Sequence, residues 1–202
     1  MKLINAPIMR IFHLNINAPN RTAFVNEGKH NMMTSIKNEP GTLFMLAGHD
    51  DKLGESNYVI ECYQDEEHYQ IHANSPQFKH YGQAAKKIIT GTEMINLKLE
   101  LVKTSTTIFR VFEDQDINAM LTKIKVRKET NFDKLTNSNT EIILAGHDKK
   151  NTGEEWVLGL SPSSIAELNL ADKAEILDQI KLKVDILVDQ GSLSYERSNN
   201  ND

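Results

Sequence analysis

The stretch TLFMLAGHDDKLGESNYVIE at Thr42–Glu61 is repeated as TEIILAGHDKKNTGEEWVLG at Thr140–Gly159, with the pentapeptide LAGHD unchanged. A shorter pair, IMRIFHL at Ile8–Leu14 and IFRVFED at Ile108–Asp114, has nearly the same separation. An internal period of about 100 residues is too long for a solenoid repeat and indicates a duplicated domain. We therefore predict a first repeat over residues 1–100 and a second repeat over residues 101–202.

In the first repeat, residue patterns predict the order β-α-β-β-α-β, which is the ferredoxin-like split unit. Asn20 is expected to cap the first helix, and Asp65 the second. Ser75 and Pro76 are expected to restart the second helix after a break, because Ser is a favoured cap and Pro suits the first helical position. Strands are expected at about residues 8–16, 43–48, 57–63 and 93–102.

The second repeat is expected to follow the same order, with its first strand at residues 108–114. The run KIKVRK at Lys123–Lys128 is interpreted as one solvated helix face. The segment SSIAELNLADKAEILDQIKLK at Ser163–Lys183 is interpreted as an amphipathic helix.

The predicted strands are apolar on both faces. Phe44 and Leu46 point one way along their strand, while Leu43, Met45 and Ala47 point the other way. Helices of the same repeat can cover only one of these faces, so a second sheet must cover the other. The predicted fold class is therefore α+β, with two ferredoxin-like repeats packed sheet to sheet as a closed α+β barrel within one chain.

Composition limits the cellular locations and the classes of binding partner that we expect for this protein. The net charge of −5 and the scattered basic residues argue against nucleic-acid binding, and no apolar stretch approaches the ~20 residues of a membrane span. The N-terminus has no apolar region of the secretory type. The single cysteine, Cys62, excludes an internal disulfide framework and suits a reducing compartment. We expect a cytoplasmic globular protein.

The segments EPGTL at Glu39–Leu43 and ECYQDEEHYQIHANSPQFKHYGQ at Glu61–Gln83 resemble the antibiotic biosynthesis monooxygenase (ABM) family. Members are chains of roughly one repeat that dimerise into an α+β barrel, so this chain is similar to that dimer made covalent. The second repeat departs from the motif, because Gly159 and Ser161 stand where the first repeat has Glu61 and Tyr63. The resemblance therefore implies one site, in the first repeat.

The resemblance also implies oxidation of a quinol-like or polyphenolic aromatic by O2, without metal, flavin or haem. Such chemistry needs a general base and a pocket that excludes water. His72 is the candidate base, because its ordinary pKa lies near neutrality. The alternative for His72 is a core or capping histidine at the helix break. The candidate substrate-binding residues are Tyr63, Tyr69, Phe78, Tyr81, Glu61, His13 and Asn17.

Several alternatives stay open. His68 and His72 have the i, i+4 spacing of a metal pair but lack an evident third ligand, so no metal or other cofactor is expected. A non-enzymatic barrel that binds an aromatic ligand competes with the enzyme. Haem degradation, known from a branch with the same fold, is disfavoured because that branch has Trp near the position of His72. The Gly-His-Asp of LAGHD is interpreted as a structural turn. Whether the pseudo-dimer forms a homodimer also stays open.

Overall fold

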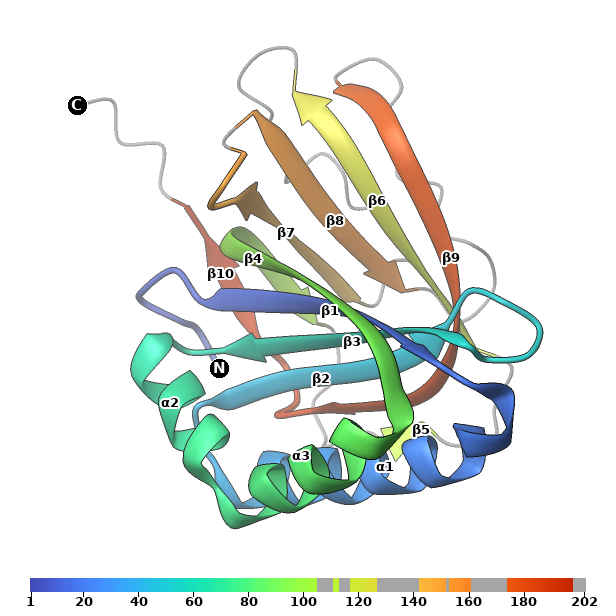
Figure 1. Cartoon of the computed structure of the whole chain (residues 1–202). Coiled ribbons are helices and arrows are strands. Elements are labelled where there is room, and N and C mark those ends of the chain that lie inside the picture. Colours follow the sequence, from blue (N-terminus) through green and yellow to red (C-terminus); the bar gives the residue numbers. More distant parts are fainter. Residues whose placement is uncertain (105–110, 113–116, 127–141, 152, 161–173, 198–202) are drawn as a thin grey trace.

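The computed structural model describes residues 1–104, 111–112, 117–126, 142–151, 153–160 and 174–197 (Figure 1). The first repeat has the predicted order, with its second helix in two pieces. Its elements are β1 (Ile8–Ile16), the short 3-10 helix η1 (Ala18–Asn20), α1 (Arg21–Asn38), β2 (Thr42–His49), β3 (Ser56–Tyr63), α2 (Glu66–Asn74), α3 (Pro76–Ile88) and β4 (Ile89–Thr104). Within the described part of the chain, no helix is both long and apolar enough to cross a membrane.

The described part of the second repeat consists of strands. They are β5 (Val111–Phe112), β6 (Asn118–Val126), β7 (Ile142–Asp148), β8 (Glu154–Leu160), β9 (Ala174–Asp189) and β10 (Ser194–Glu196). Within the first repeat the strands lie in the order β4-β1-β3-β2, and within the second in the matching order β9-β6-β8-β7. The second repeat therefore rebuilds the four-stranded sheet of the first.

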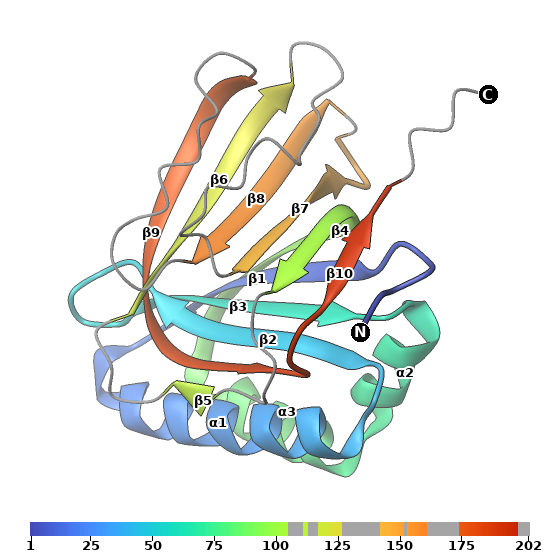
Figure 2. The ribbon, with the colours of Figure 1, turned by 180° about the vertical axis from the view of Figure 1, so that it is seen from behind.

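The two sheets join into one closed ring through two antiparallel seams. At one seam β2 pairs with β9, and at the other β4 pairs with β7. Figure 2 shows β9 running from the second repeat down beside β2. Since both seams are hydrogen-bonded, neither sheet keeps a free edge there. The expected closed α+β barrel is confirmed.

Each seam depends on the glycine of LAGHD. A Cβ on Gly48 would lie 2.6 Å from the carbonyl oxygen of Lys183, and a Cβ on Gly146 would lie 2.8 Å from the Cα of Leu99. The pairing register also shifts at both places, which marks an irregularity in each ladder. A side chain at either glycine would push the two strands apart, so the motif recurs because the seam recurs.

The histidine of LAGHD contacts a carboxylate of the opposite repeat at each seam. His49 Nδ1 lies 3.3 Å from an oxygen of Asp185 on β9, and His147 Nδ1 lies 3.3 Å from an oxygen of Glu100 on β4. Asp185 and Glu100 occupy the same place in two strands of equal length. These contacts support a structural role for Gly-His-Asp. The motif lies at the ends of β2 and β7, however, and does not itself form the turn that was expected.

The barrel has an apolar interior, and three helices cover the outer face of the first sheet. Figure 1 shows α1, α2 and α3 along one side of the first-repeat strands. Phe24, Met32 and Ile36 of α1 pack against Met45 and Val59 of that face, and all five are buried. The interior contains side chains from both repeats, including Met9, Ile11, Phe44, Leu46, Ile60, Cys62, Leu97, Leu121, Leu144, Leu158 and Leu182.

The sequence prediction misplaced the first strand of the second repeat. The strand that matches β1 is β6, at Asn118–Val126, and not residues 108–114. Of the predicted segment, Val111–Phe112 forms the short strand β5, which pairs with β9. Both segments mix apolar and polar residues in a way that suits a strand, so local pattern could not tell which would take the central position. Pairing with β8 and β9 selects β6.

Two predicted helical segments are strands where the structure describes them. Lys123–Val126 of the KIKVRK run belongs to β6, and Ala174–Lys183 belongs to β9. In β9 buried Leu182 and Val184 alternate with exposed Lys181 and Lys183, which is the period of a half-buried strand. The rest of the predicted amphipathic helix, residues 163–173, lies outside the described residues. β4 is also longer than expected, and runs on to Thr104.

Substitution of a seam glycine tests the closure of the ring. Gly48→Ala is expected to lower the free energy of unfolding by about 1–3 kcal/mol, because the new methyl group overpacks against the Lys183 carbonyl. Gly82→Ala is the matched control. No atom lies within 4 Å of its added Cβ, so this helical position should become more stable by up to about 1 kcal/mol. Urea unfolding measures both changes, and equal stability of Gly48→Ala and the wild type would contradict the close approach at the seam.

Candidate functional site

Two side-chain caps position the helices of the site. The Asp65 carboxylate accepts a hydrogen bond of 3.0 Å from the backbone amide of His68, which starts α2. Ser75 accepts from the amide of Phe78 at 3.3 Å and starts α3, with Pro76 at the first position of that helix. The caps predicted at Asp65 and Ser75 are confirmed, whereas Asn20 stands at the N-cap position of α1 without a side-chain hydrogen bond to that helix. The break between α2 and α3 leaves His72 in the last turn of α2.

His72 is fully buried and paired with a carboxylate. Its Nδ1 lies 3.0 Å from an oxygen of Glu39, and the Thr42 hydroxyl donates to the same oxygen at 2.7 Å. The Gln77 amide donates to the other oxygen of Glu39. Burial alone would raise the pKa of Glu39, but the hydrogen bonds from His72 and Thr42 outweigh it and lower the pKa below its ordinary value. A charged carboxylate therefore faces the imidazole.

The Nε2 atom of His72 is buried and makes no hydrogen bond to any described residue. In the neutral form of the imidazole that has its proton on Nδ1, facing Glu39, this nitrogen carries the lone pair. A buried nitrogen without a partner has a free-energy cost, and such positions often mark functional sites. His72 thus has the form of a base held in one tautomer.

The four predicted aromatic residues lie next to His72 or next to one another. Ring centroids of Phe78 and Tyr63 lie 4.8 Å and 5.4 Å from that of His72. Tyr69 lies 5.4 Å from Tyr63, and Tyr81 lies 6.3 Å from Phe78. Residues from β3, α2 and α3 therefore form one continuous aromatic wall around the imidazole.

Arg10 on β1 closes the far side of this wall. Its guanidinium lies 3.4 Å from the centre of the Tyr69 ring and forms an ion pair of 2.8 Å with Glu66. It also donates to the side chain of Asn96 at 3.2 Å. These contacts fix Tyr69 by a cation–π interaction. The recurrence of Arg10 and Arg110 in the sequence did not point to this role.

Glu61 is a buried carboxyl group on the helix-facing side of β3. The Tyr63 hydroxyl donates to one of its oxygens at 2.8 Å. Burial raises the pKa of Glu61, although the charge of His72, the Tyr63 hydrogen bond and the charge of Arg10 each oppose the rise. The sequence left Glu61 as a pocket carboxylate or a solvent-exposed edge residue, and the structure places it in the wall of a cleft.

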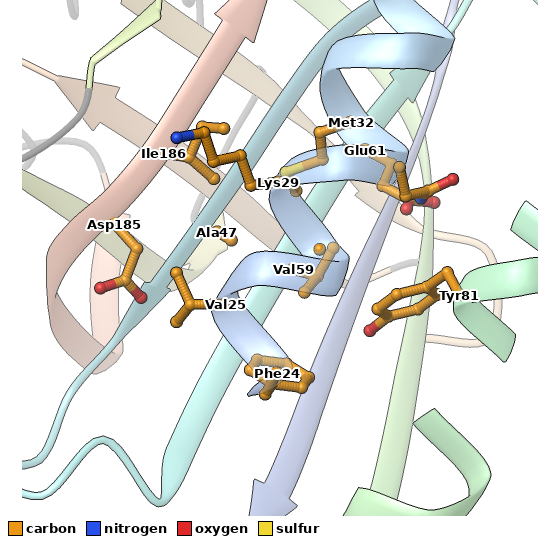
Figure 3. Close-up of a pocket in the computed structure, with 12 residues that line it drawn as sticks. Phe24, Val25, Lys29, Met32, Ala47, Val59, Glu61, Tyr81, Asp185 and Ile186 are labelled. Carbon is orange, nitrogen blue, oxygen red and sulfur yellow. The ribbon is translucent and has the colours of Figure 1, made fainter. Parts of the chain in front are cut away.

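A narrow cleft lies between α1 and the outer face of the first sheet (Figure 3). Its volume of about 20 Å³ is enough for a water molecule. Figure 3 shows Asp185 at one end and Glu61 with Tyr81 at the other, so a carboxyl group stands at each end of the cleft, and Lys29 also lines it. The apolar lining consists of Phe24, Val25, Met32, Ala47, Val59 and Ile186.

Two predicted site residues lie away from this cleft. His13 stacks on Tyr58, with ring centroids 4.5 Å apart, and its Nε2 lies 3.0 Å from the Ser56 hydroxyl. Asn17 is exposed in the short connection between β1 and η1. Neither residue is part of the cleft lining or of the aromatic wall.

Several residues of the site escaped the sequence analysis. Glu39 stands first in the EPGTL motif, so a signal for the carboxylate partner of His72 was present, although no rule of spacing links residues 33 positions apart. Asp185 and Ile186 come from β9 of the second repeat. They reach the cleft only because the barrel closes, and no local pattern reports that contact.

His68 and His72, which have the i, i+4 spacing of a metal pair, have separate partners in the structure. His68 Nδ1 lies 2.6 Å from Asp65, whereas His72 turns inward to Glu39. Across the described residues, no group of three His, Cys, Asp or Glu side chains is placed to hold a metal ion.

Residues 7–84 match the model of the family described as Antibiotic biosynthesis monooxygenase. This stretch runs from β1 into α3 and contains the His72–Glu39 pair, the aromatic wall and Glu61. The resemblance expected from the sequence is confirmed for this part of the chain. No curated protein matches the chain.

Two solved structures share the whole arrangement. A protein from Lactobacillus acidophilus NCFM, provisionally described as a monooxygenase, is 22% identical, with a TM-score of 0.78 over 95% of this chain and 100% of that one. A protein from Fusobacterium nucleatum, described in the same way, is 16% identical, with a TM-score of 0.78 over 97% of this chain and 100% of that one. At such identities the likeness shows the fold alone, and it extends over both repeats.

The buried Glu61 is expected to make stability depend on pH. The pKa of Glu61 in the folded chain is raised above the unfolded value near 4.5. Its contribution to the free energy of unfolding is therefore fully present below pH 4.5 and is lost as the pH rises through the folded pKa. Glu61→Gln keeps an acceptor for the Tyr63 hydroxyl and removes the titration. Its free energy of unfolding should therefore fall less than that of the wild type between pH 4 and pH 8 in urea titrations.

The exposed Gln64, next to β3, provides the control for this titration. Gln64→Ala removes no titrating group and should follow the wild-type pH curve. Parallel curves for Glu61→Gln and the wild type would contradict the assignment of a raised pKa to Glu61.

Proposed function

We propose that this chain, whose residues 7–84 match the ABM family, is a cofactor-independent monooxygenase that oxidises a quinol-like or polyphenolic aromatic with O2. The observation that carries the proposal is the buried His72–Glu39 pair, in which Nδ1 lies 3.0 Å from the carboxylate and Nε2 has no described partner. A small aromatic substrate and O2 are the proposed partners, and the cytoplasm is the proposed location.

In this proposal His72 is the general base. The Glu39 carboxylate keeps the proton on Nδ1, so Nε2 is available to accept a proton from a phenolic hydroxyl. The same carboxylate stabilises the imidazolium that forms, as the acid of a catalytic triad does. Thr42 and Gln77 hold the carboxylate in place through their hydrogen bonds.

Removal of the hydroxyl proton prepares the substrate to react with O2. The phenolate is more electron-rich than the phenol and can transfer electrons to O2 directly. One oxygen atom is then added to the ring and the other leaves as water. The quinol supplies all four electrons, two in its oxidation to the quinone level and two in the hydroxylation of the ring carbon. A hydroquinone and O2 thus give a hydroxyquinone and water, so the reaction requires no additional reductant.

The proposed substrate position joins the cleft to the aromatic wall. Tyr81 lines the cleft, Phe78 lies between Tyr81 and His72, and both residues are on α3. A cleft of about 20 Å³ is too small for an aromatic ring, so binding requires α1 and α3 to separate. Closure over the ring would exclude water from the reacting atoms. Tyr63 and Tyr69 are proposed to orient the substrate hydroxyl.

Oxygen uptake tests the role of His72. Purified protein, stripped of metals, is offered menadiol and a small set of polyphenols in an oxygen-electrode assay. His72→Ala is expected to lower kcat by roughly 100-fold or more, because a positioned base contributes 10²–10⁴-fold. His68→Ala is the matched control, one turn earlier on α2 and bonded only to Asp65 among the described residues. It should keep the wild-type rate.

Glu39→Gln is a second test of the His72–Glu39 pair, which remains informative if His72→Ala fails to fold. It preserves the shape of the pair and removes the negative charge, so kcat should fall while the circular-dichroism spectrum stays unchanged. Uptake no faster than autoxidation for wild-type protein across the panel would refute the enzyme. Saturable binding without a product would then assign the fold to a non-enzymatic aromatic-binding barrel.

A further inference from the structure

We propose that Asp185, a residue of the second repeat, positions helix α1 over the cleft of the first repeat and thereby sets how tightly the cleft binds its aromatic ligand. The proposal rests on the proposed function only in taking that ligand to be the substrate. It gives the second repeat, which lacks the family motif, a direct part in the site.

An ion pair between Arg21 and Asp185 joins the two repeats at the start of α1. Arg21 is the first residue of α1, and its Nη2 donates to an oxygen of Asp185 at 2.5 Å. The two side chains are 20% and 16% exposed, so water only partly screens the pair. This contact ties the start of α1 to a strand 164 residues further along the chain.

Arg21 is held from three sides. Besides Asp185, its guanidinium donates to the side-chain oxygen of Asn57 at 2.5 Å and to Nδ1 of His49 at 2.8 Å. A planar guanidinium bound in this way has little freedom to reorient. Asp185 is the only one of these three partners that carries a permanent negative charge. Its neutralisation would therefore leave a partly buried cation without a counter-charge.

Asp185 also forms part of the cleft wall. Asp185 and Ile186 of β9 line the cleft together with Phe24, Val25 and Met32 of α1. Figure 3 shows Asp185 at the end of the cleft away from Glu61 and Tyr81. A shift of the first turns of α1 would move Phe24 and Val25, and with them one wall of the cleft. Because the catalytic His72 lies beyond the other end, such a shift should alter binding more than the chemical step.

The opposite seam provides a matched control. Glu100 takes the place of Asp185 there, and pairs with His147 at 3.3 Å and with Arg197 at 2.6 Å. Glu100 does not line the cleft, and its ion-pair partners His147 and Arg197 lie on β7 and just after β10, away from α1. A variant at Glu100 thus weakens a seam in the same way as one at Asp185, but leaves the Arg21–Asp185 ion pair at the start of α1 intact.

The test compares Asp185→Asn with Glu100→Gln. Asp185→Asn is expected to raise KM for menadiol, and Kd for 1-naphthol measured in the absence of O2, roughly tenfold or more, with kcat changed by less than about twofold. Hydrogen exchange of the first amides of α1 should also become faster. Glu100→Gln should leave both binding constants and α1 exchange at wild-type values.

The double variant Arg21→Gln/Asp185→Asn distinguishes loss of the Arg21–Asp185 ion pair from a general loss of stability. Arg21→Gln should reproduce the effects of Asp185→Asn, and the double variant should be no worse than either single variant, because both remove one interaction. Equal effects of Asp185→Asn and Glu100→Gln on binding, or unchanged α1 exchange in Asp185→Asn, would overturn the proposal. If wild-type protein binds 1-naphthol but oxidises nothing, the monooxygenase proposal fails, while binding and exchange still decide the role of Asp185.

Discussion

The close approach of backbones at the two seams is the constraint on which the rest of the structure depends. At Gly48 and at Gly146 the neighbouring strand lies where any side chain would stand. This approach lets β2 pair with β9 and β4 pair with β7, so that eight strands close into a ring. Closure buries one face of every sheet against the other repeat and leaves the outer face of the first sheet for the helices. The LAGHD pentapeptide is therefore retained in both repeats for architectural reasons, although only one repeat carries the family motif.

The two repeats share a framework and differ in their chemistry. In the first repeat, α2 and α3 bring His72, Phe78 and Tyr81 against β3, and the EPGTL turn supplies Glu39. In the second repeat Gly159 and Ser161 replace the acid and the tyrosine of the motif. A buried ionisable cluster has a free-energy cost unless its members satisfy one another, so a repeat that loses part of the cluster can lose the rest without a loss of stability. What the second repeat contributes to the cleft comes from β9, through Asp185 and Ile186.

Much of the fold could be predicted from the sequence, because repetition and strand alternation report directly on pairing and burial. The order of the first repeat, the caps at Asp65 and Ser75, and the closed barrel followed from local chemistry and from strands apolar on both faces. The errors arose where one segment fits two patterns. Residues 174–183 carry apolar side chains at helical spacing, yet Leu182 and Val184 alternate with lysines as in a strand, and pairing with β2 and β6 decides between them. The site was predictable only as far as the motif extends. His72 and its aromatic neighbours lie in that motif, whereas Asp185 joins the cleft through a contact that only the closed ring creates.

We propose that the ligand binds between α1 and the first sheet, and not inside the barrel. The most direct measurement is a crystal structure of the protein with bound 1-naphthol, a phenol that cannot form a quinol redox pair. We expect ring density between α1 and β3, with the hydroxyl near Nε2 of His72 and near Tyr63, and with α1 and α3 further apart than in the unbound protein. Ring density among the apolar side chains of the barrel interior, or against the second repeat alone, would contradict it.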